Sequence, residues 1–171
     1  MTRRLPQEFR QLRALWCAGA CLAILVVVVG FQYFHPLPKE TVVRRVVDGD
    51  TIELASRQLV RYIGMDTPEV RRRVDHHWVF DPEPFGVKAM EENRRFAEGK
   101  RVTLEYDAES HDRYGRLLAY VYVDGQMVNE QLVAEGYARP LRIPPNIKYA
   151  ERFKSLAQAA KRQKRGLWKE D

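Results

Sequence analysis

Short apolar stretches between residues 41 and 123 are typical of β-strands. Some are rich in β-branched residues, and others alternate apolar with polar side chains. Two of them run into Asp-Gly dipeptides, Asp48-Gly49 and Asp124-Gly125, which favour hairpin turns. The pattern predicts five strands, at residues 41–47, 51–54, 59–65, 102–106 and 117–123.

Helical periodicity interleaves with these strands in the second half of the chain. Residues 87–98 have apolar side chains on one side and are followed by a glycine, which predicts a helix that stops there. Asn129 is expected to cap a short helix and Asn146 a longer one. The longer helix has an apolar stripe at Tyr149, Phe153, Leu156 and Ala160. Five strands in mixed order with about three helices predict an α+β fold, a small barrel with helices packed around it.

The N-terminal part of the chain has a different pattern. Residues 14–31 contain no charged side chain, and as a helix they would span about 27 Å, close to the hydrocarbon core of a bilayer. Aromatic residues lie at both ends, at Trp16 and at Tyr33-Phe34, as is common at membrane interfaces. These features predict a single transmembrane helix at residues 14–34.

The charges that flank this run predict its orientation. Four arginines precede it, and no basic residue follows it before Lys39, so residues 1–13 are expected in the cytoplasm. A cleavable signal peptide and a lipidated Cys21 are the alternatives, but the long apolar run with no small-x-small site after it favours an uncleaved signal anchor. We therefore expect a linker at residues 35–40 and one domain at 41–171, located in the periplasm or outside the cell.

Composition narrows the class of protein further. The 171 residues leave room for one domain beside the anchor, and 30% charged with 45% hydrophobic residues excludes a disordered chain and a polytopic membrane protein. Both cysteines lie in the apolar run, so the domain has neither a disulfide framework nor a cysteine zinc site. The net charge of +6 permits an anionic partner without requiring one.

Three short segments concentrate the residues that could carry chemistry. They are Asp48-Gly49-Asp50-Thr51, the run from Arg61 to Glu69, and Asp112-Arg113-Tyr114-Gly115-Arg116. Each alone would be an ordinary turn or a solvated strand end. Together they place several carboxylates and arginines in one small domain, a combination that suits a cation and a phosphate.

These motifs resemble the staphylococcal nuclease (thermonuclease-like) family. The resemblance covers residues 40–168 and rests on VVDGDTIEL, RYIGMDTPE, DRYGRLLAYVYVDGQMVNEQLVAEGYAR and AQAAKRQKRGLW. It implies a five-stranded OB-fold barrel with helices, in agreement with the predicted elements. It also implies a phosphodiester hydrolase that acts on DNA and RNA, prefers unpaired strands and leaves 3′-phosphate ends.

The resemblance implies a role for each candidate site residue. Asp50 and Asp66 match the carboxylates that bind Ca²⁺, Thr67 matches a residue that offers its backbone carbonyl to the metal, and Asp48 matches an acid beside them. Glu69 matches the carboxylate that activates water. The residues that match substrate contacts are Arg61 and Arg116 for phosphate, and Tyr114 and Arg113 for the nucleotide.

Elementary chemistry supports these roles. Hydrolysis of a phosphodiester adds negative charge at phosphorus, so the site must neutralise charge and position a water. Ca²⁺ accepts carboxylates, carbonyls and waters, and arginine presents a planar fork to phosphate oxygens. The alternative is a catalytically weak module of the same fold that only binds nucleic acid or protein. The sequence indicates no obligate protein partner.

Two segments depart from the family pattern. Residues 70–83 are unusual, and we expect a solvated loop there; the alternatives are that Arg71–Arg73 attract a nucleic-acid backbone and Trp78 stacks on a base, or that Asp75, His76 and His77 bind a metal. The stretch 139–146 contains three prolines and no aromatic residue that could contact a nucleotide.

Overall fold

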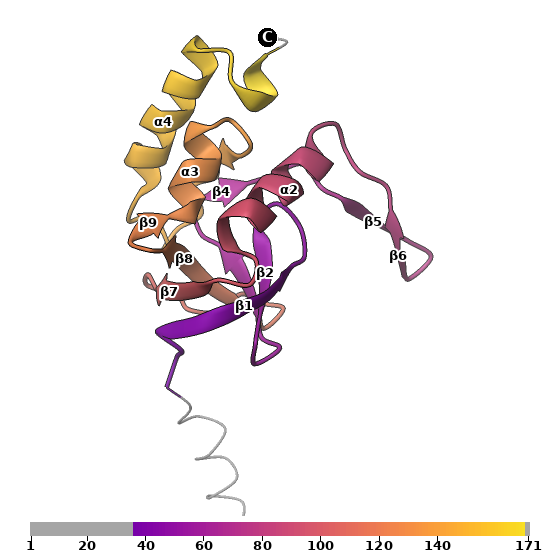
Figure 1. The fold of residues 1–171 in the computed structure, drawn as a ribbon, viewed down its shortest axis with the longest axis vertical. Helices are drawn as coiled ribbons and strands as arrows, with labels where there is room; N and C mark the ends of the chain where they lie inside the picture. Colours follow the sequence, from indigo (N-terminus) through magenta and orange to yellow (C-terminus); the bar gives the residue numbers. More distant parts are fainter. Residues whose placement is uncertain (1–35, 170–171) are drawn as a thin grey trace, which may run out of the picture. The chain divides into compact units, whose positions relative to one another are not determined.

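The barrel predicted from the sequence is present in the computed structural model, which describes residues 36–169. Its strands are β1 (Glu40–Val46), β2 (Thr51–Leu54), β3 (Leu59–Tyr62), β7 (Arg101–Glu105) and β8 (Leu117–Val123). They are hydrogen-bonded in the order β3-β2-β1-β7-β8, and a parallel pairing of β3 with β8 closes the sheet (Figure 1). This strand order is that of a five-stranded OB barrel.

Three helices pack around the barrel, as expected. They are α2 (Gly86–Ala97), α3 (Val128–Ala134) and α4 (Ala150–Arg162), followed by a short 3-10 turn, η1 (Gly166–Trp168). The remaining strands are the short pieces β4 (Met65–Asp66), β5 (Arg71–Val74), β6 (His77–Phe80), β9 (Gln126–Met127) and β10 (Arg139–Pro140). Within residues 36–169, no helix has the length and apolar character needed to cross a membrane. The anchor predicted at residues 14–34 lies outside this described range.

Apolar side chains from every barrel strand fill the interior. The largest fully buried ones include Tyr62, Ile52, Leu54, Val60, Val102, Leu117 and Tyr120. Helix α4 contributes Phe153, whose ring packs edge-on against Tyr120 with centroids 6.1 Å apart. This continuous core fixes the strands from which the polar side chains described below project.

The strand predicted at residues 59–65 is interrupted. It separates into β3 and β4 at Gly64, which has a φ of +82°. A Cβ at this position would lie 2.5 Å from the Phe153 ring, so only glycine allows the close approach of α4. Beyond the break, Asp66 pairs with Arg139 of β10 rather than with the barrel.

The two asparagines expected to cap helices do something else. Asn129 lies inside α3, where its side chain accepts a hydrogen bond from the Val121 N–H (2.9 Å) and donates one to the Ile63 carbonyl (3.0 Å). Asn146 lies before α4, and its amide bonds both backbone groups of Glu109, at 2.8 Å each. Both predictions of a cap are wrong, because each amide joins segments distant in sequence.

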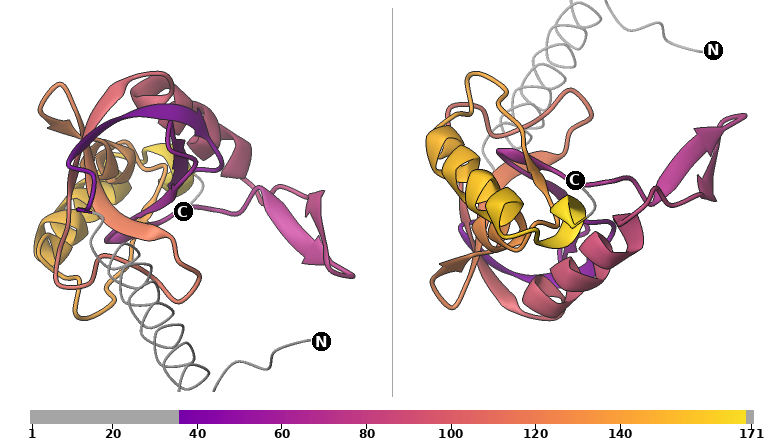
Figure 2. Two further views of the ribbon diagram at one scale, coloured as in Figure 1. Left: turned by 90° about the horizontal axis from the view of Figure 1, so that it is seen from below. Right: turned by 90° about the horizontal axis from the view of Figure 1, so that it is seen from above.

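The expected loop after Glu69 is a β-hairpin, in which β5 pairs antiparallel with β6. We refer to residues 71–80 as the arm. Its two-residue turn, Asp75-His76, has positive φ at both positions (45° and 66°), the geometry of a type I′ turn. All eight strand residues are exposed, and the arm stands clear of the barrel in both views of Figure 2.

Candidate active site

The turn between β1 and β2 places two carboxylates at one end of the barrel. Asp48 and Asp50 flank Gly49, and the turn closes through bonds from the Val47 and Asp48 N–H groups to the Thr51 carbonyl. A Cβ on Gly49 would lie 2.5 Å from Thr67 Oγ1 and 2.7 Å from its Cβ. The glycine is therefore needed so that Thr67 can pack against the turn.

Asp50 is buried, with 1% of its surface exposed, and both of its carboxylate oxygens are hydrogen-bonded. Oδ2 accepts from the Thr67 N–H and from Thr67 Oγ1, both at 3.2 Å. Oδ1 accepts from Thr51 Oγ1 at 3.1 Å and forms an ion pair with Arg61. A buried carboxylate held this way cannot rotate without losing several bonds at once.

The Arg61 guanidinium joins two of the candidate metal ligands. It projects from β3, its Nη1 pairs with Asp50, and its Nη2 lies 2.5 Å from Asp66 Oδ1. Asp50 is buried whereas the Asp66 side chain is 52% exposed, so the cluster reaches from the barrel wall to solvent. We refer to Asp48, Asp50, Arg61, Asp66 and Thr67 as the turn cluster.

A buried chain of hydrogen bonds supports the turn from behind. The Tyr62 hydroxyl donates to Asn93 Oδ1 (2.8 Å), and Asn93 Nδ2 donates to the Asp48 carbonyl (3.0 Å). The Asp48 carboxylate in turn accepts from the Asp50 N–H at 3.1 Å. Sequence reasoning missed Asn93, although a polar residue on the apolar face of α2 was a signal for it.

Glu69 lies between the turn cluster and the arm. Its N–H donates to Glu83 Oε2 (3.2 Å), its carbonyl accepts from the Glu83 N–H (2.8 Å), and Gly86 packs against that same carbonyl. The backbone is thus held while the side chain stays exposed. Partial burial and the charge of Asp48 raise the pKa of Glu69, with Arg61 opposing them.

Arg116 is positioned by a compact turn of the third motif. Its Nε and its N–H donate to the two carboxylate oxygens of Asp112, at 2.7 and 3.0 Å, and the Tyr114 N–H adds a third bond at 2.9 Å. Burial would raise the pKa of Asp112, but these bonds outweigh it and hold that pKa below its usual range. Tyr114, 69% exposed, lies beneath the guanidinium groups of Arg113 and Arg116.

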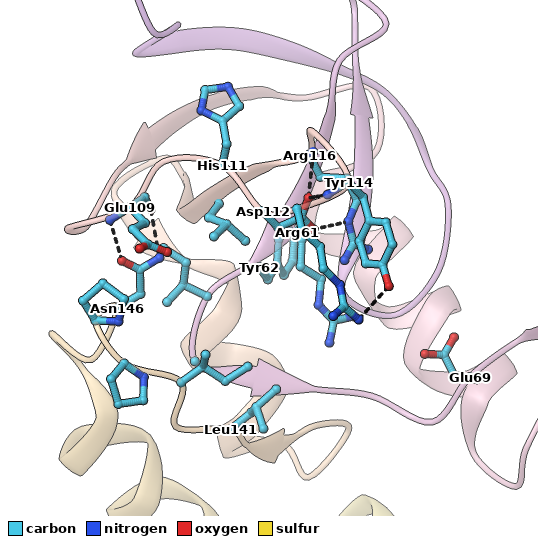
Figure 3. A pocket seen from close by; sticks show the side chains of 17 residues that line it. Arg61, Tyr62, Glu69, Glu109, His111, Asp112, Tyr114, Arg116, Leu141 and Asn146 are labelled. Atoms are coloured by element: carbon cyan, nitrogen blue, oxygen red, sulfur yellow. Dashed lines mark hydrogen bonds and ion pairs between the residues drawn. The ribbon is translucent and has the colours of Figure 1, made fainter.

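A cleft of about 480 Å³ collects residues from two of the three motifs (Figure 3). Arg61, Tyr114 and Arg116 gather in the middle of the view, with Glu69 at one side. The Glu109–Asn146 pair lies at the other side of the view. Four apolar residues that the sequence did not predict also line the cleft: Leu141, Ile143, Pro144 and Pro145. Arginine side chains beside an apolar surface suit a ligand in which a phosphate is joined to a base.

The turn cluster sets three carboxyl groups against one guanidinium. Asp48, Asp50 and Asp66 all act on the single guanidinium of Arg61, which leaves two negative charges over when all three are ionised. Burial raises the pKa of Asp50 to about 8, Arg61 lowers it, and the other two carboxylates add to the rise. Such a cluster favours an additional divalent cation.

The donor atoms of the turn cluster fit a hard cation. They are carboxylate oxygens, the ligands that Ca²⁺ and Mg²⁺ prefer. Among residues 36–169, no three His, Cys, Asp or Glu side chains gather as a complete metal-ligating group. A cation held here would therefore complete its shell with a carbonyl, water or substrate oxygens.

The structure brings most of the predicted site residues together. Five of them line the cleft: Arg61, Glu69, Arg113, Tyr114 and Arg116. The other four, Asp48, Asp50, Asp66 and Thr67, adjoin it through Arg61 and its neighbours. None of the nine lies in a remote part of the domain.

Comparison with known proteins points in the same direction. Residues 59–170 match the model of a family described as "Staphylococcal nuclease homologue", a range that contains Arg61, Glu69 and Arg116 but begins after Asp50. The chain is 40% identical over 127 residues to a thermonuclease of Staphylococcus hyicus, covering 72% of each chain. It is 36% identical over 161 residues to a thermonuclease of Staphylococcus intermedius, covering 86% of this chain and 93% of the relative.

A similarity of the same degree extends to a second genus. The chain is 41% identical over 129 residues to the SPbeta prophage-derived endonuclease YokF of Bacillus subtilis, a match that covers 72% of this chain and 42% of that protein. The relatives are thus nucleases, in proteins of different length.

Proposed function

This chain belongs to the staphylococcal nuclease family, and from that premise we propose that it is a Ca²⁺-dependent endonuclease that hydrolyses DNA and RNA. Membership of the family makes the chain a phosphodiester-hydrolysing nuclease. Its dependence on Ca²⁺, its action on both DNA and RNA, and the roles of its residues are what we propose. The observation that carries it is the Arg61 guanidinium bound to both Asp50 and Asp66, next to the cleft that Glu69 and Arg116 line.

Asp50, Asp66 and the Thr67 carbonyl would hold the Ca²⁺. When bound, the cation supplies Lewis-acid activation and charge neutralisation at the phosphate. Thr67 also holds the Asp50 carboxylate by two hydrogen bonds, so this ligand is fixed before any cation arrives. Fixed ligands lower the cost of ordering the site.

Arg61 and Arg116 bind the phosphate. Both line the cleft, and a guanidinium can donate two parallel hydrogen bonds to phosphate oxygens. Each is held by carboxylates, Arg61 by Asp50 and Asp66 and Arg116 by Asp112. The two forks thereby stabilise the charge that develops as water attacks phosphorus.

Glu69 accepts the proton of the attacking water. The water oxygen forms a bond to phosphorus, the bond from phosphorus to the 5′-oxygen breaks, and that oxygen takes a proton from solvent to become a hydroxyl. The products are a 3′-phosphate and a 5′-hydroxyl end. An exposed carboxylate on a fixed backbone at the edge of the cleft supports this role.

Tyr114 and Arg113 contact the nucleotide next to the scissile bond. The exposed Tyr114 ring offers a stacking surface for a base, and Arg113 lies over that ring with its Nη2 bonded to the tyrosine hydroxyl at 2.8 Å. Stacking needs an unpaired base, which supports a preference for single strands.

We also propose that residues 14–34 anchor the enzyme in a membrane with its domain outside the cytoplasm. The uncharged run and the arginines before it support this topology. A reporter that is active only outside the cytoplasm, fused after Asp171, should give a signal. Signal from a reporter that is active only in the cytoplasm would reverse the topology.

Cleavage by the full chain in a mild detergent tests the nuclease proposal. Single-stranded DNA and RNA are incubated with the protein in Ca²⁺ or in EDTA, and the ends are examined by direct labelling of 5′-hydroxyls with a polynucleotide kinase. We expect cleavage of both substrates in Ca²⁺ only, with 5′-hydroxyl ends.

The variant Glu69→Gln should lower kcat about 10²- to 10⁴-fold, the usual contribution of a general base. The matched control is Glu91→Gln, the same change on an exposed residue of α2. Equal activity of the two variants would remove Glu69 from the mechanism. Binding of single strands without cleavage by the wild type would favour the binding module instead.

A further inference from the structure

The arm exposes large apolar side chains that lie outside the hydrophobic core. β5 and β6 form a two-stranded sheet of their own, and an isolated two-stranded hairpin is at best marginally stable in water. Trp78 is 69% and Phe80 62% exposed. Clustered exposed aromatic side chains mark interaction surfaces more often than structural ones.

The register of the hairpin places these aromatic residues opposite arginines. Arg71 pairs with Phe80 and Arg73 pairs with Trp78, and because side chains alternate along a strand, all four lie on one face. We refer to these four residues as the arm face. The opposite face has the pairs Arg72 with Val79 and Val74 with His77.

The two faces also differ in charge. Arg72, on the opposite face, forms an ion pair with Asp81 at 2.8 Å. Within residues 36–169, neither Arg71 nor Arg73 has an ion-pair partner. The arm face therefore presents two uncompensated guanidinium groups, each beside an aromatic ring.

The arm begins two residues after Glu69, the candidate catalytic carboxylate. Its base is closed by bonds from the Asp81 N–H to the Val70 carbonyl (3.2 Å) and from the Glu83 N–H to the Glu69 carbonyl (2.8 Å). The chain from Glu69 to Asp75, about six residue steps, extends about 20 Å at strand geometry. That length corresponds to about six phosphates at the spacing of a stacked strand.

We propose that the arm face binds the part of an unpaired nucleic-acid strand that extends beyond the cleft. Arg71 and Arg73 contact phosphates, while Trp78 and Phe80 stack on bases. The inference rests on the proposed function, since the strand is the substrate of the neighbouring cleft. A membrane-inserting face would need contiguous apolar side chains, whereas here each ring stands opposite an arginine.

Binding of a labelled single-stranded 20-mer and of a trinucleotide to the full chain tests the proposal. Fluorescence anisotropy in EDTA keeps the strands intact, so the measurement does not depend on catalysis. We expect Trp78→Ser and Arg73→Gln each to raise the Kd for the 20-mer about tenfold and to leave the Kd for the trinucleotide unchanged.

The opposite face supplies matched controls. Val79→Ser and Arg72→Gln alter neighbouring residues by equivalent changes and should leave both Kd values at the wild-type level. Equal Kd values for the 20-mer in all four variants would overturn the proposal. A wild type that binds the 20-mer through the arm face but does not cleave it in Ca²⁺ would contradict the proposed function while supporting strand binding by the arm face.

Lipid contact is the competing outcome. The full chain is reconstituted in vesicles of anionic phospholipid, and the Trp78 signal is taken as the fluorescence difference between wild type and Trp78→Phe. Quenching of that signal by the 20-mer supports base stacking. Quenching by brominated lipid, with no response to the 20-mer, would overturn the proposal.

Discussion

The turn cluster and the arm both adjoin Glu69, yet the first is built on the buried, densely hydrogen-bonded Asp50 while the second is exposed along its whole length. Asp50 has 1% of its surface exposed and partners for both oxygens, whereas Trp78 is 69% exposed. The difference separates two demands on a nuclease. Groups that act on the reacting phosphate must be fixed, and groups that hold a flexible strand can stay adaptable.

Among the changes that test this comparison, the largest effect is expected for Arg61→Lys. An ammonium keeps the positive charge but cannot join Asp50 and Asp66 while offering a fork to phosphate, so kcat should fall about 10²- to 10³-fold. Steady-state cleavage kinetics and a melting curve measure it. Arg57→Lys, an exposed arginine at the turn between β2 and β3, is the control. Wild-type kcat in Arg61→Lys would refute a role for the fork.

The next effect is expected for Gly49→Ala. The added methyl group would displace Thr67 from the turn, and a shift of about 1 Å in a reacting group can cost about 100-fold in rate. Overpacking should also destabilise the fold by about 1–3 kcal/mol. Urea unfolding and kcat are measured together.

Gly99→Ala is the control for stability in that experiment. Gly99 has a φ of +72° and open space around it, so alanine costs about 1–2 kcal/mol of backbone strain without touching the site. If both variants lost activity equally, stability rather than the position of Thr67 would explain the loss.

A smaller effect is expected for Asp112→Asn, which tests the third motif. Asp112 contacts no substrate in the proposed function and acts as a positioning residue for Arg116. Loss of the charge should raise KM about tenfold through looser phosphate binding, with a smaller change in kcat. A fall in kcat with unchanged KM would contradict this role.

The effect of Asp112→Asn on the unfolding free energy should also depend on pH. The folded-state pKa of Asp112 lies below its unfolded value, so its stabilising contribution is full above the unfolded pKa and is lost as pH falls through the folded one. The difference in unfolding free energy between wild type and Asp112→Asn should therefore be largest near neutral pH and shrink in acid. Urea titrations from pH 7 downward measure it, and a constant difference would exclude the ionised carboxylate as its source.

The smallest effect is expected for stability changes in the arm. Trp78→Ser and Phe80→Ser replace side chains that contact no core, so each should alter the unfolding free energy by less than about 0.5 kcal/mol. Val70→Ala, buried at the base of the arm, should cost more. Destabilisation of several kcal/mol by Trp78→Ser would show that the arm stabilises the fold, and the contrast with the turn cluster would then be wrong.

The barrel could be predicted because local sequence patterns indicate each of its strands. Alternation and Asp-Gly turns indicated all five strands, and the structure confirms them within one or two residues except at Gly64. There the break depends on the ring of Phe153, about ninety residues away in the chain, which no local pattern contains. The arm was missed since Asp75-His76 is not a recognised hairpin dipeptide.

The site could be predicted only through the family motifs. Asp50, Arg61 and Asp66 come together because β2 pairs with β3 and the chain then breaks at Gly64, and no spacing rule specifies that meeting. The converse holds for Asn129 and Asn146. Asparagine is a common cap residue, but each of these side-chain amides instead bonds backbone groups that are distant in the sequence. The predicted membrane anchor and its orientation stay predictions.

The parallel pairing of β3 with β8 has a consequence for the order of folding. Arg61 lies on β3 and Arg116 immediately precedes β8, more than fifty residues later in the chain. Closing so long a loop is slow and entropically costly, so this contact belongs to the last stage of assembly. A chain still being synthesised or only partly folded therefore holds the two arginines apart, and its ability to cut nucleic acid begins only with barrel closure.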